Sequence, residues 1–270
     1  MIQEVIQKLI AGQDLDRDEA RAVMDQIMSG GATDAQIGAF LIALRIKGET
    51  IDEIAGCAQG MREKATPVVT SRSDLIDTCG TGGDGSGTFN ISTTVAFVAC
   101  GAGLAVAKHG NRSISSQCGS ADVLGELGVN IEAPPEQVGE CIDEVGIGFL
   151  FAIALHGAMK HAIGPRKELA TRTVFNALGP LTNPAGAKRQ LIGVYDGSLT
   201  DRIAGVLNEL GSERAFVVHG SDGLDEITLT GPTRVSELND GQIITREISP
   251  GDFGLEMVAA EALAGGDAAH

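Results

Sequence analysis

The first 66 residues carry a helical pattern of hydrophobic positions. Five apolar side chains recur there at three- and four-residue spacing, which places them on one face of a helix. They are Ile2, Val5, Ile6, Leu9 and Ile10. A second helix is expected over 16–28, and two more begin at the capping-box sequences TDAQ (33–36) and TIDE (50–53). No cluster of reactive side chains stands out, so we expect this segment to serve packing or a subunit interface.

The pattern changes at Ser73, where short apolar runs begin to alternate with helical segments. Strands are expected over 75–78, 103–107, 129–132, 148–153, 190–195 and 214–218. Helices are expected over 92–100, 120–127, 136–144 and 200–210. Residues 156–184 are again helical and loop-like, whereas 227–250 are rich in β-branched residues and turn dipeptides, which is typical of short antiparallel strands. The order of elements predicts an α/β fold class, in which a small all-helical domain precedes a larger α/β domain with a mainly parallel central sheet.

Composition narrows the classes of function. No apolar run is long enough to span a membrane, and the N-terminus lacks the features of a signal peptide. Five cysteines without a C-x-x-C pair argue against a disulfide framework or a zinc knuckle, so we expect a cytoplasmic protein. A net charge of −16, no tryptophan and one tyrosine make nucleic-acid binding an unfavourable interpretation.

A glycine-rich stretch, DTCGTGGDGSGTFNIST (77–93), follows the first strand of the α/β part. It contains G-x-G-x-x-G, but the next helix is expected only near Ser92 and the next strand ends in Lys108-His109 instead of an acid, which argues against a dinucleotide site. The P-loop lysine is also missing. We interpret the stretch as a loop whose backbone approaches a phosphorylated sugar; the alternative is a plain surface turn. Asp84 would then face sugar hydroxyls or a hydrated metal.

Cationic and acidic side chains follow two other strands. Lys108 and Arg112, in KHGNR, come at the carboxyl end of a strand, where open α/β sheets bind ligands, and Ser113, Ser115, Ser116 and Ser120 add hydroxyl donors. Asp225-Glu226 lies on a loop after the strand that ends in VVHG and suits Mg²⁺ held beside substrate phosphates. His156 and His161 lack a third ligand for a transition metal. Arg166 could bind a carboxylate through a two-pronged contact.

Several of these motifs together resemble anthranilate phosphoribosyltransferase. They are GTGGD (80–84), NIST (90–93), KHGNR with the following serines (108–116), GSADVL (119–124), RTVFNALGPLTNP (172–184) and GLDE (223–226). The resemblance covers essentially the whole chain. It implies transfer of a phosphoribosyl group from phosphoribosyl pyrophosphate (PRPP) to the amine of anthranilate in tryptophan biosynthesis, with no covalent nucleophile on the enzyme and with Lys108 and a metal stabilising the transition state.

The resemblance also implies roles for individual residues. PRPP would be held by Gly80, Gly82, Gly83, Asp84, Thr88, Asn90, Ile91, Ser92, Thr93, Lys108, Ser116 and Ser120. Anthranilate would contact Gly80, Asn111, His156 and Arg166, and Mg²⁺ would be served by Ser92, Asp225 and Glu226. The implied fold is of the nucleoside phosphorylase and phosphoribosyltransferase type. Its helical domain spans 1–71 with 160–185 crossing back into it, its α/β domain spans 72–159 and 186–270, the substrate cleft lies between the two, and the protein is a homodimer through the helical domain.

The chain departs from the family pattern at three places. FAIALHGAMK (151–160) lacks two prolines of the usual F-A-P-x-x-H-P-A-M-K, so Ile153 and Gly157 stand where they are expected. Ala170 stands where a glycine is usual. The sequence ends at GGDAAH, where the family continues, so we expect an α/β domain shortened at its C-terminus and reduced in stability or activity.

Two alternatives remain in view. A pyrimidine nucleoside phosphorylase shares the architecture but uses phosphate and a nucleoside, and GTGGD with KHGNR and GPLTNP favours the transferase over it. A non-catalytic relative that binds nucleic acid or another partner should carry a basic surface and lack Asp225, Glu226 or Arg166, whereas this chain is acidic and keeps all three.

Overall fold

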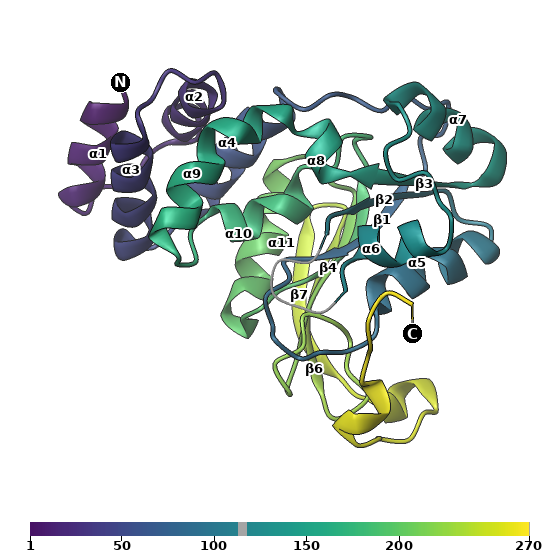
Figure 1. Ribbon diagram of the computed structural model, residues 1–270. Helices are drawn as coiled ribbons and strands as arrows, with labels where there is room; N and C mark the ends of the chain where they lie inside the picture. The colour runs from purple at the N-terminus through teal and green to yellow at the C-terminus, as the bar shows by residue number, and fades with distance from the viewer. Residues whose placement is uncertain (113–117, 270) are drawn as a thin grey trace. The chain divides into compact units, whose positions relative to one another are not determined.

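The computed structural model describes residues 1–112 and 118–269, which divide into two compact units. One unit comprises Met1–Thr66 and His156–Thr182 and is built of helices; the other comprises Pro67–Leu155 and the described residues from Asn183 on. The second passage through the helical unit therefore begins at His156. Both units can be followed by colour along the chain in Figure 1.

The helical unit contains α1 (Ile2–Ile10), α2 (Arg17–Met28), α3 (Asp34–Lys47), α4 (Ile51–Arg62), α9 (Lys160–Leu169) and α10 (Phe175–Leu178). Two short 3₁₀ turns, Gly157–Met159 and Gly179–Leu181, flank α9 and α10. Thr33 and Thr50 form capping boxes with Gln36 and Glu53, which confirms the predicted starts of α3 and α4. Four of the five apolar residues predicted on one face of α1 are buried, whereas Ile10, at the helix end, is exposed.

The α/β unit is organised around one seven-stranded sheet. Its strands are β1 (Ile76–Gly80), β2 (Val106–Gly110), β3 (Ile147–Phe151), β4 (Arg189–Gly193), β5 (Arg214–Gly220), β6 (Thr233–Asn239) and β7 (Gln242–Ile248). They lie in the order β3-β2-β1-β4-β5-β6-β7. The first five are parallel, and β6 and β7 continue the sheet as an antiparallel pair, so the predicted mainly parallel sheet with antiparallel strands after residue 227 is confirmed.

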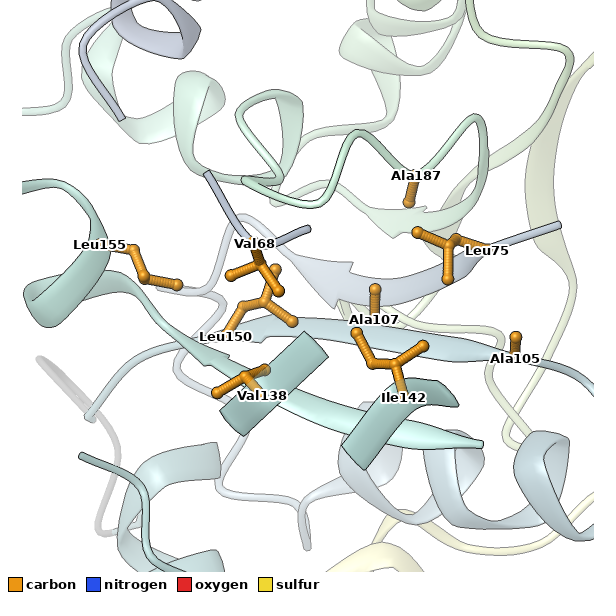
Figure 2. Close-up of a cluster of buried hydrophobic side chains, with 9 residues drawn as sticks. All are labelled: Val68, Leu75, Ala105, Ala107, Val138, Ile142, Leu150, Leu155 and Ala187. Atoms are coloured by element: carbon orange, nitrogen blue, oxygen red, sulfur yellow. The ribbon is translucent and has the colours of Figure 1, made fainter. Parts of the chain in front are cut away.

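Helices cover both faces of this sheet. The helices of this unit are α5 (Ile91–Gly101), α6 (Ser120–Glu126), α7 (Pro135–Val145), α8 (Ala152–Leu155) and α11 (Thr200–Glu209). Among them, α5 and α7 pack against the strands β1–β3, and α11 packs against β5 and β6. Figure 1 shows α7 and α5 on opposite sides of β1–β3. Figure 2 shows Val138 and Ile142 of α7 turned toward Ala107 and Leu150 of the strands, within a cluster that also includes Val68, Leu75, Ala105, Leu155 and Ala187. Burial of this apolar surface ties α7 to the sheet.

Two local predictions were wrong. No strand forms over 129–132, because Gly128 adopts φ +84° and the N–H of Val129 donates to the carbonyl of Leu124, which closes α6 in a Schellman motif. Lys108 and His109 belong to β2 itself and do not follow it, because β2 begins three residues later than predicted.

The last described residues return to the glycine-rich stretch. After two 3₁₀ turns, Pro250–Phe253 and Ala260–Leu263, the N–H of Gly265 donates to the carbonyl of Gly87, and the N–H of Phe89 donates to the carbonyl of Leu263. Thr88 and Ala264 form an isolated antiparallel bridge between these bonds. Across the described residues, no helix combines the length and the hydropathy needed to cross a bilayer, and no disulfide forms among the five cysteines.

Candidate active site

The glycine-rich loop and the acidic loop meet at the carboxyl end of β1. The N–H of Gly82 donates to the Asp225 carboxylate at 2.7 Å. A β-carbon on Gly80 would lie 2.4 Å from Asp225 Oδ2, so only glycine allows this approach. Four further glycines of the loop, Gly82, Gly83, Gly85 and Gly87, adopt φ between +66° and +77°, which L side chains rarely do. The loop is thus shaped by close packing against Asp225 as well as by left-handed turns.

Three carboxylates share this corner. Burial, and then the nearby charge of Asp84, raises the pKa of Asp225 to about 6. Burial, and then the charge of Asp225, raises the pKa of Glu226 to about 8, although Lys108 and the Ser92 backbone act in the opposite direction. The Asp84 carboxylate accepts hydrogen bonds from the Ser86 hydroxyl at 2.5 Å and the Ser86 N–H at 3.4 Å. Both pKa values are raised first by burial and then by the neighbouring carboxylates, and a cation bound here would favour the charged forms of both groups.

Lys108 brings a buried positive charge to the same region. Its side chain is 2% exposed and donates to the Thr78 carbonyl at 2.5 Å and to the Ser92 hydroxyl at 3.3 Å. Burial lowers the pKa of Lys108, and the negative charges of Asp77 and Glu226 oppose that shift. The ammonium therefore joins β1 and β2 to the first turn of α5.

The first turn of α5 carries four of the predicted PRPP residues. Asn90 occupies the N-cap position of the helix, and its side-chain amide donates to the Cys118 carbonyl at 3.3 Å. Ile91 and Ser92 are the first two helical residues, and the Ser92 carbonyl accepts from the Thr78 hydroxyl at 2.9 Å. The Thr93 hydroxyl is buried and has no hydrogen-bond partner within residues 1–112 and 118–269. A buried hydroxyl in this condition at a helix N-terminus is suited to an anionic ligand.

The remaining predicted residues of the α/β unit have different surroundings. Asn111 is exposed, and its side-chain oxygen accepts from the Arg112 N–H at 2.8 Å. Arg112 forms an ion pair with Asp122 and lies 5.8 Å from the centroid of the Phe151 ring. Ser120 is the first residue of α6. Ser113, Ser115 and Ser116 lie outside the described residues.

His156 and Arg166 belong to the helical unit. Burial lowers the pKa of His156 to about 4, so the imidazole is neutral near pH 7. The Arg166 guanidinium lies 5.0 Å from the centroid of the Phe175 ring, and burial lowers the pKa of that arginine. Phe175 therefore provides an aromatic surface for the cation. His161, the second histidine of the stretch, packs with its ring against Gly30.

The sequence interpretation missed three residues at this site. Asp77 is fully buried and accepts from the Asn183 amide at 2.8 Å and from the His109 N–H at 3.0 Å. Gly193 ends β4 against the backbone of Asp225. Asp77 carried a signal, because a charged residue inside an otherwise apolar strand needs a buried partner. Nothing in the sequence near Asn183 or Gly193 indicated a place at this site, because their contacts depend on segments far apart in the sequence.

The donor set fits magnesium better than a transition metal. In the part of the chain that the structure describes, no three His, Cys, Asp or Glu side chains are arranged as a metal cage. Mg²⁺ does not need one, because it is usually held by one or two carboxylates together with waters and substrate phosphates. The adjacent carboxyl groups of Asp225 and Glu226 provide the two oxygen ligands that this arrangement requires.

Comparison with known proteins identifies the family of this chain. Residues 72–270 match the a/b domain of the glycosyl transferase family, and residues 3–65 match the helical bundle domain of that family. The chain is 59% identical over 268 residues to an anthranilate phosphoribosyltransferase of Moorella thermoacetica, covering 99% of this chain and 79% of that protein. It is 60% identical over 269 residues to the enzyme of the same name from Anaeromyxobacter sp. strain K, and the match covers 100% of this chain and 80% of that protein.

Solved structures give the same result. The anthranilate phosphoribosyltransferase of Thermus thermophilus superposes with a TM-score of 0.92 at 46% identity, covering 98% of this chain and 78% of that one. The Saccharomyces cerevisiae enzyme in complex with PRPP and Mg superposes with a TM-score of 0.89 at 29% identity, and the match covers 99% of this chain and 78% of the yeast chain. Another structure of the yeast enzyme contains 4-fluoroanthranilate. With both domains matched and identity near 60% over the whole chain, this chain belongs to the anthranilate phosphoribosyltransferases of the glycosyl transferase family.

Proposed function

We propose that this chain transfers the phosphoribosyl group of PRPP to the amine of anthranilate, giving phosphoribosylanthranilate and pyrophosphate, through the residues described above. The observation that carries the proposal is the meeting of the Gly80–Asp84 loop, Lys108 and the Asp225-Glu226 pair at the carboxyl edge of the sheet. That edge is where open α/β sheets bind their ligands.

The PRPP site would extend from the glycine-rich loop to the start of α5. Its residues are Gly80, Gly82, Gly83, Asp84, Thr88, Asn90, Ile91, Ser92, Thr93, Lys108, Ser116 and Ser120. The Thr93 hydroxyl is buried and has no hydrogen-bond partner among the described residues. Together with the Lys108 ammonium, it supports a phosphate near the first turn of α5. Asp84, already surrounded by negative charge, suits sugar hydroxyls or metal-bound water better than a phosphate oxygen.

Ser92, Asp225 and Glu226 would hold Mg²⁺. When bound, the ion would neutralise part of the charge of the pyrophosphate. The yeast relative was solved with PRPP and Mg together, which supports the same pairing of ligands here. In this chain the Gly82 N–H and the Ser92 backbone orient the two carboxylates by hydrogen bonding to them.

Anthranilate would contact Gly80, Asn111, His156 and Arg166. Arg166 suits the carboxylate of anthranilate, because a guanidinium can bind it with two parallel hydrogen bonds. His156 is neutral near pH 7 and adds no charge beside the acceptor amine. The yeast complex with 4-fluoroanthranilate supports an acceptor of this shape.

The chemistry then depends on position and charge. The aromatic amine of anthranilate is neutral near pH 7, so it can attack C1 of the ribose without a strong base. Negative charge builds on the departing pyrophosphate, where Lys108 and backbone N–H groups would stabilise it. Alignment of two bound substrates can lower the activation barrier of the reaction by as much as roughly 7–11 kcal/mol. No side chain acts as a covalent nucleophile in this scheme, and trapping a ribosyl-enzyme adduct would contradict it.

The assembly and the compartment complete the proposal. Exposed isoleucines of the helical unit, Ile10, Ile46 and Ile51, support a homodimer through that unit, because apolar side chains in a shared interface leave water. Cysteines without disulfides support a cytoplasmic location. Sedimentation equilibrium of the wild type and of Ile46→Lys checks the first point: the substitution should shift the protein toward the monomer, and a wild type that is monomeric throughout would contradict it.

One assay tests the reaction. Anthranilate is fluorescent, so its consumption by the enzyme with PRPP and Mg²⁺ can be followed directly. We expect loss of the signal with the wild type and little loss with the double variant Asp225→Asn, Glu226→Gln. Full activity of the double variant would contradict the metal assignment. Phosphorolysis of thymidine or uridine, with no consumption of anthranilate, would favour the nucleoside phosphorylase alternative.

A further inference from the structure

The two strands that flank the proposed phosphate site are paired along only part of their length. In the described part of the chain, β1 pairs with β2 at one position, Ile76 with Val106, whereas it pairs with β4 at five. β2 likewise pairs with β3 at five positions. In a regular parallel ladder, the next step would direct the His109 N–H at the Thr78 carbonyl. Both of these groups instead bond to side chains.

Three side chains meet the backbone groups at this step. The His109 N–H donates to Asp77 Oδ1 at 3.0 Å, and the Thr78 carbonyl accepts from Lys108 Nζ at 2.5 Å. The Ala107 carbonyl accepts from the Asn183 amide at 2.8 Å. The carboxyl ends of β1 and β2 are therefore joined through side chains, where a ladder would join backbone to backbone.

Asn183 completes the arrangement from a distant segment. Its amide donates to Asp77 Oδ2 as well as to Ala107, and its oxygen accepts from the Ala185 N–H at 2.9 Å. It is 4% exposed, and Asp77 is completely buried. Asp77 lies beside Ala107 on one face of the sheet, whereas Thr78, Lys108 and Ser92 meet on the other, toward α5.

Stability alone does not account for this network. Burying a carboxylate and an ammonium to satisfy backbone groups costs desolvation energy, and a plain backbone ladder would satisfy them without any charge. The structural result of this network is that the Lys108 ammonium lies between Thr78 and Ser92, beside the first turn of α5.

We propose that Asp77 and Asn183 are positioning residues that hold the carboxyl ends of β1 and β2 apart, so that the Lys108 ammonium lies between them and faces the phosphates of the donor substrate. The inference rests on the proposed function, in which Lys108 binds PRPP. Neither residue touches substrate; both act through the geometry of β2.

The test is Asn183→Ala, which removes the donor to Asp77 and Ala107 without adding bulk. We expect the dissociation constant for PRPP, measured by calorimetry with Mg²⁺ and without anthranilate, to rise about tenfold, the change that follows from one lost buried hydrogen bond to a charged group. In steady-state kinetics the KM for PRPP should rise, while the KM for anthranilate should stay within about twofold. The matched control is Asp201→Ala, which breaks hydrogen bonds to Ser236 and Arg234 elsewhere in the same unit.

The two variants separate positioning from general destabilisation. Both should lower the melting temperature, but only Asn183→Ala should weaken PRPP binding. Unchanged PRPP binding in folded Asn183→Ala, or equal changes for PRPP and anthranilate, would overturn the inference. If Asn183→Ala does not fold, Asn183→Ser is judged by the same criteria, because its hydroxyl keeps one of the two donated bonds. A wild type that does not bind PRPP would instead overturn the proposed function and this inference with it.

Discussion

The backbone carbonyl oxygen of Asp225 lies 1.5 Å from the position that a β-carbon on Gly193 would take. A methyl group cannot share that space, so the end of β4 must carry glycine if the acidic loop is to reach β1. Gly193 therefore governs where the proposed metal ligands stand.

We expect Gly193→Ala to displace Asp225 and to break its hydrogen bond with the Gly82 N–H. The apparent Mg²⁺ affinity should fall about tenfold or more, in the range found for residues that orient metal ligands. Titration of activity with Mg²⁺ measures the change. Gly157→Ala is the control, because a β-carbon there meets nothing within 4 Å. Equal Mg²⁺ dependence in Gly193→Ala and the wild type would contradict the steric argument.

The buried imidazole of His156 should make the stability of the protein depend on pH. Its pKa is lowered from 6.5 to about 4 in the folded chain, so the unfolded state binds more protons between these values. The contribution is complete above pH 6.5 and is lost as the pH falls toward 4, to a total of about 3 kcal/mol. Urea unfolding of the wild type and His156→Gln at several pH values measures it. The wild type should lose stability more steeply over this window, and parallel curves would show that burial of His156 has no such effect.

Ala170 ends α9 in the left-handed conformation, with φ +46° and ψ +31°. A side chain costs about 1 kcal/mol in that conformation, whereas glycine adopts it freely. Ala170→Gly should therefore raise the free energy of unfolding by up to about 1 kcal/mol. Ala22→Gly, inside α2, is the matched control and should lower it by a similar amount. Thermal melts of the two variants decide the matter, and a lower melting temperature for Ala170→Gly would refute the prediction.

Phe175 should influence anthranilate through Arg166. Its ring lies 5.0 Å from the guanidinium, and replacement by leucine keeps the apolar bulk but removes the aromatic face. We expect Phe175→Leu to raise the KM for anthranilate about two- to fivefold, the fold-change that corresponds to a cation–π contact, without changing the KM for PRPP. Phe40→Leu, at another buried ring of the helical unit, controls for the lost volume. The same KM values in both variants would exclude this role for Phe175.

Local pattern accounts for most of the elements. The capping boxes at Thr33 and Thr50 and the alternation after Ser73 were sufficient to predict helices and strands close to those observed, because caps and periodicity act within a few residues. The strand predicted over 129–132 failed because of a local interaction as well. Val129 and Ile131 suit a strand, but Gly128 turns the chain and the Val129 N–H closes α6.

The residues of the site also fall into those that the sequence predicted and those that only the structure revealed. The sequence motifs were sufficient to predict Lys108, Asp225 and Glu226 as site residues. Charged residues next to predicted strand ends and to a glycine-rich loop can be recognised from the sequence without a structure. They could not show that Lys108 lies inside β2, that Asp77 and Asn183 join β1 to β2, or that Thr88 pairs with Ala264. Each of those contacts joins segments that only the sheet order and the return of the chain bring together. The residue types were thus determined by the sequence, whereas their burial, charge interactions and partners were decided by tertiary packing, because desolvation and hydrogen bonding depend on what surrounds a group in space.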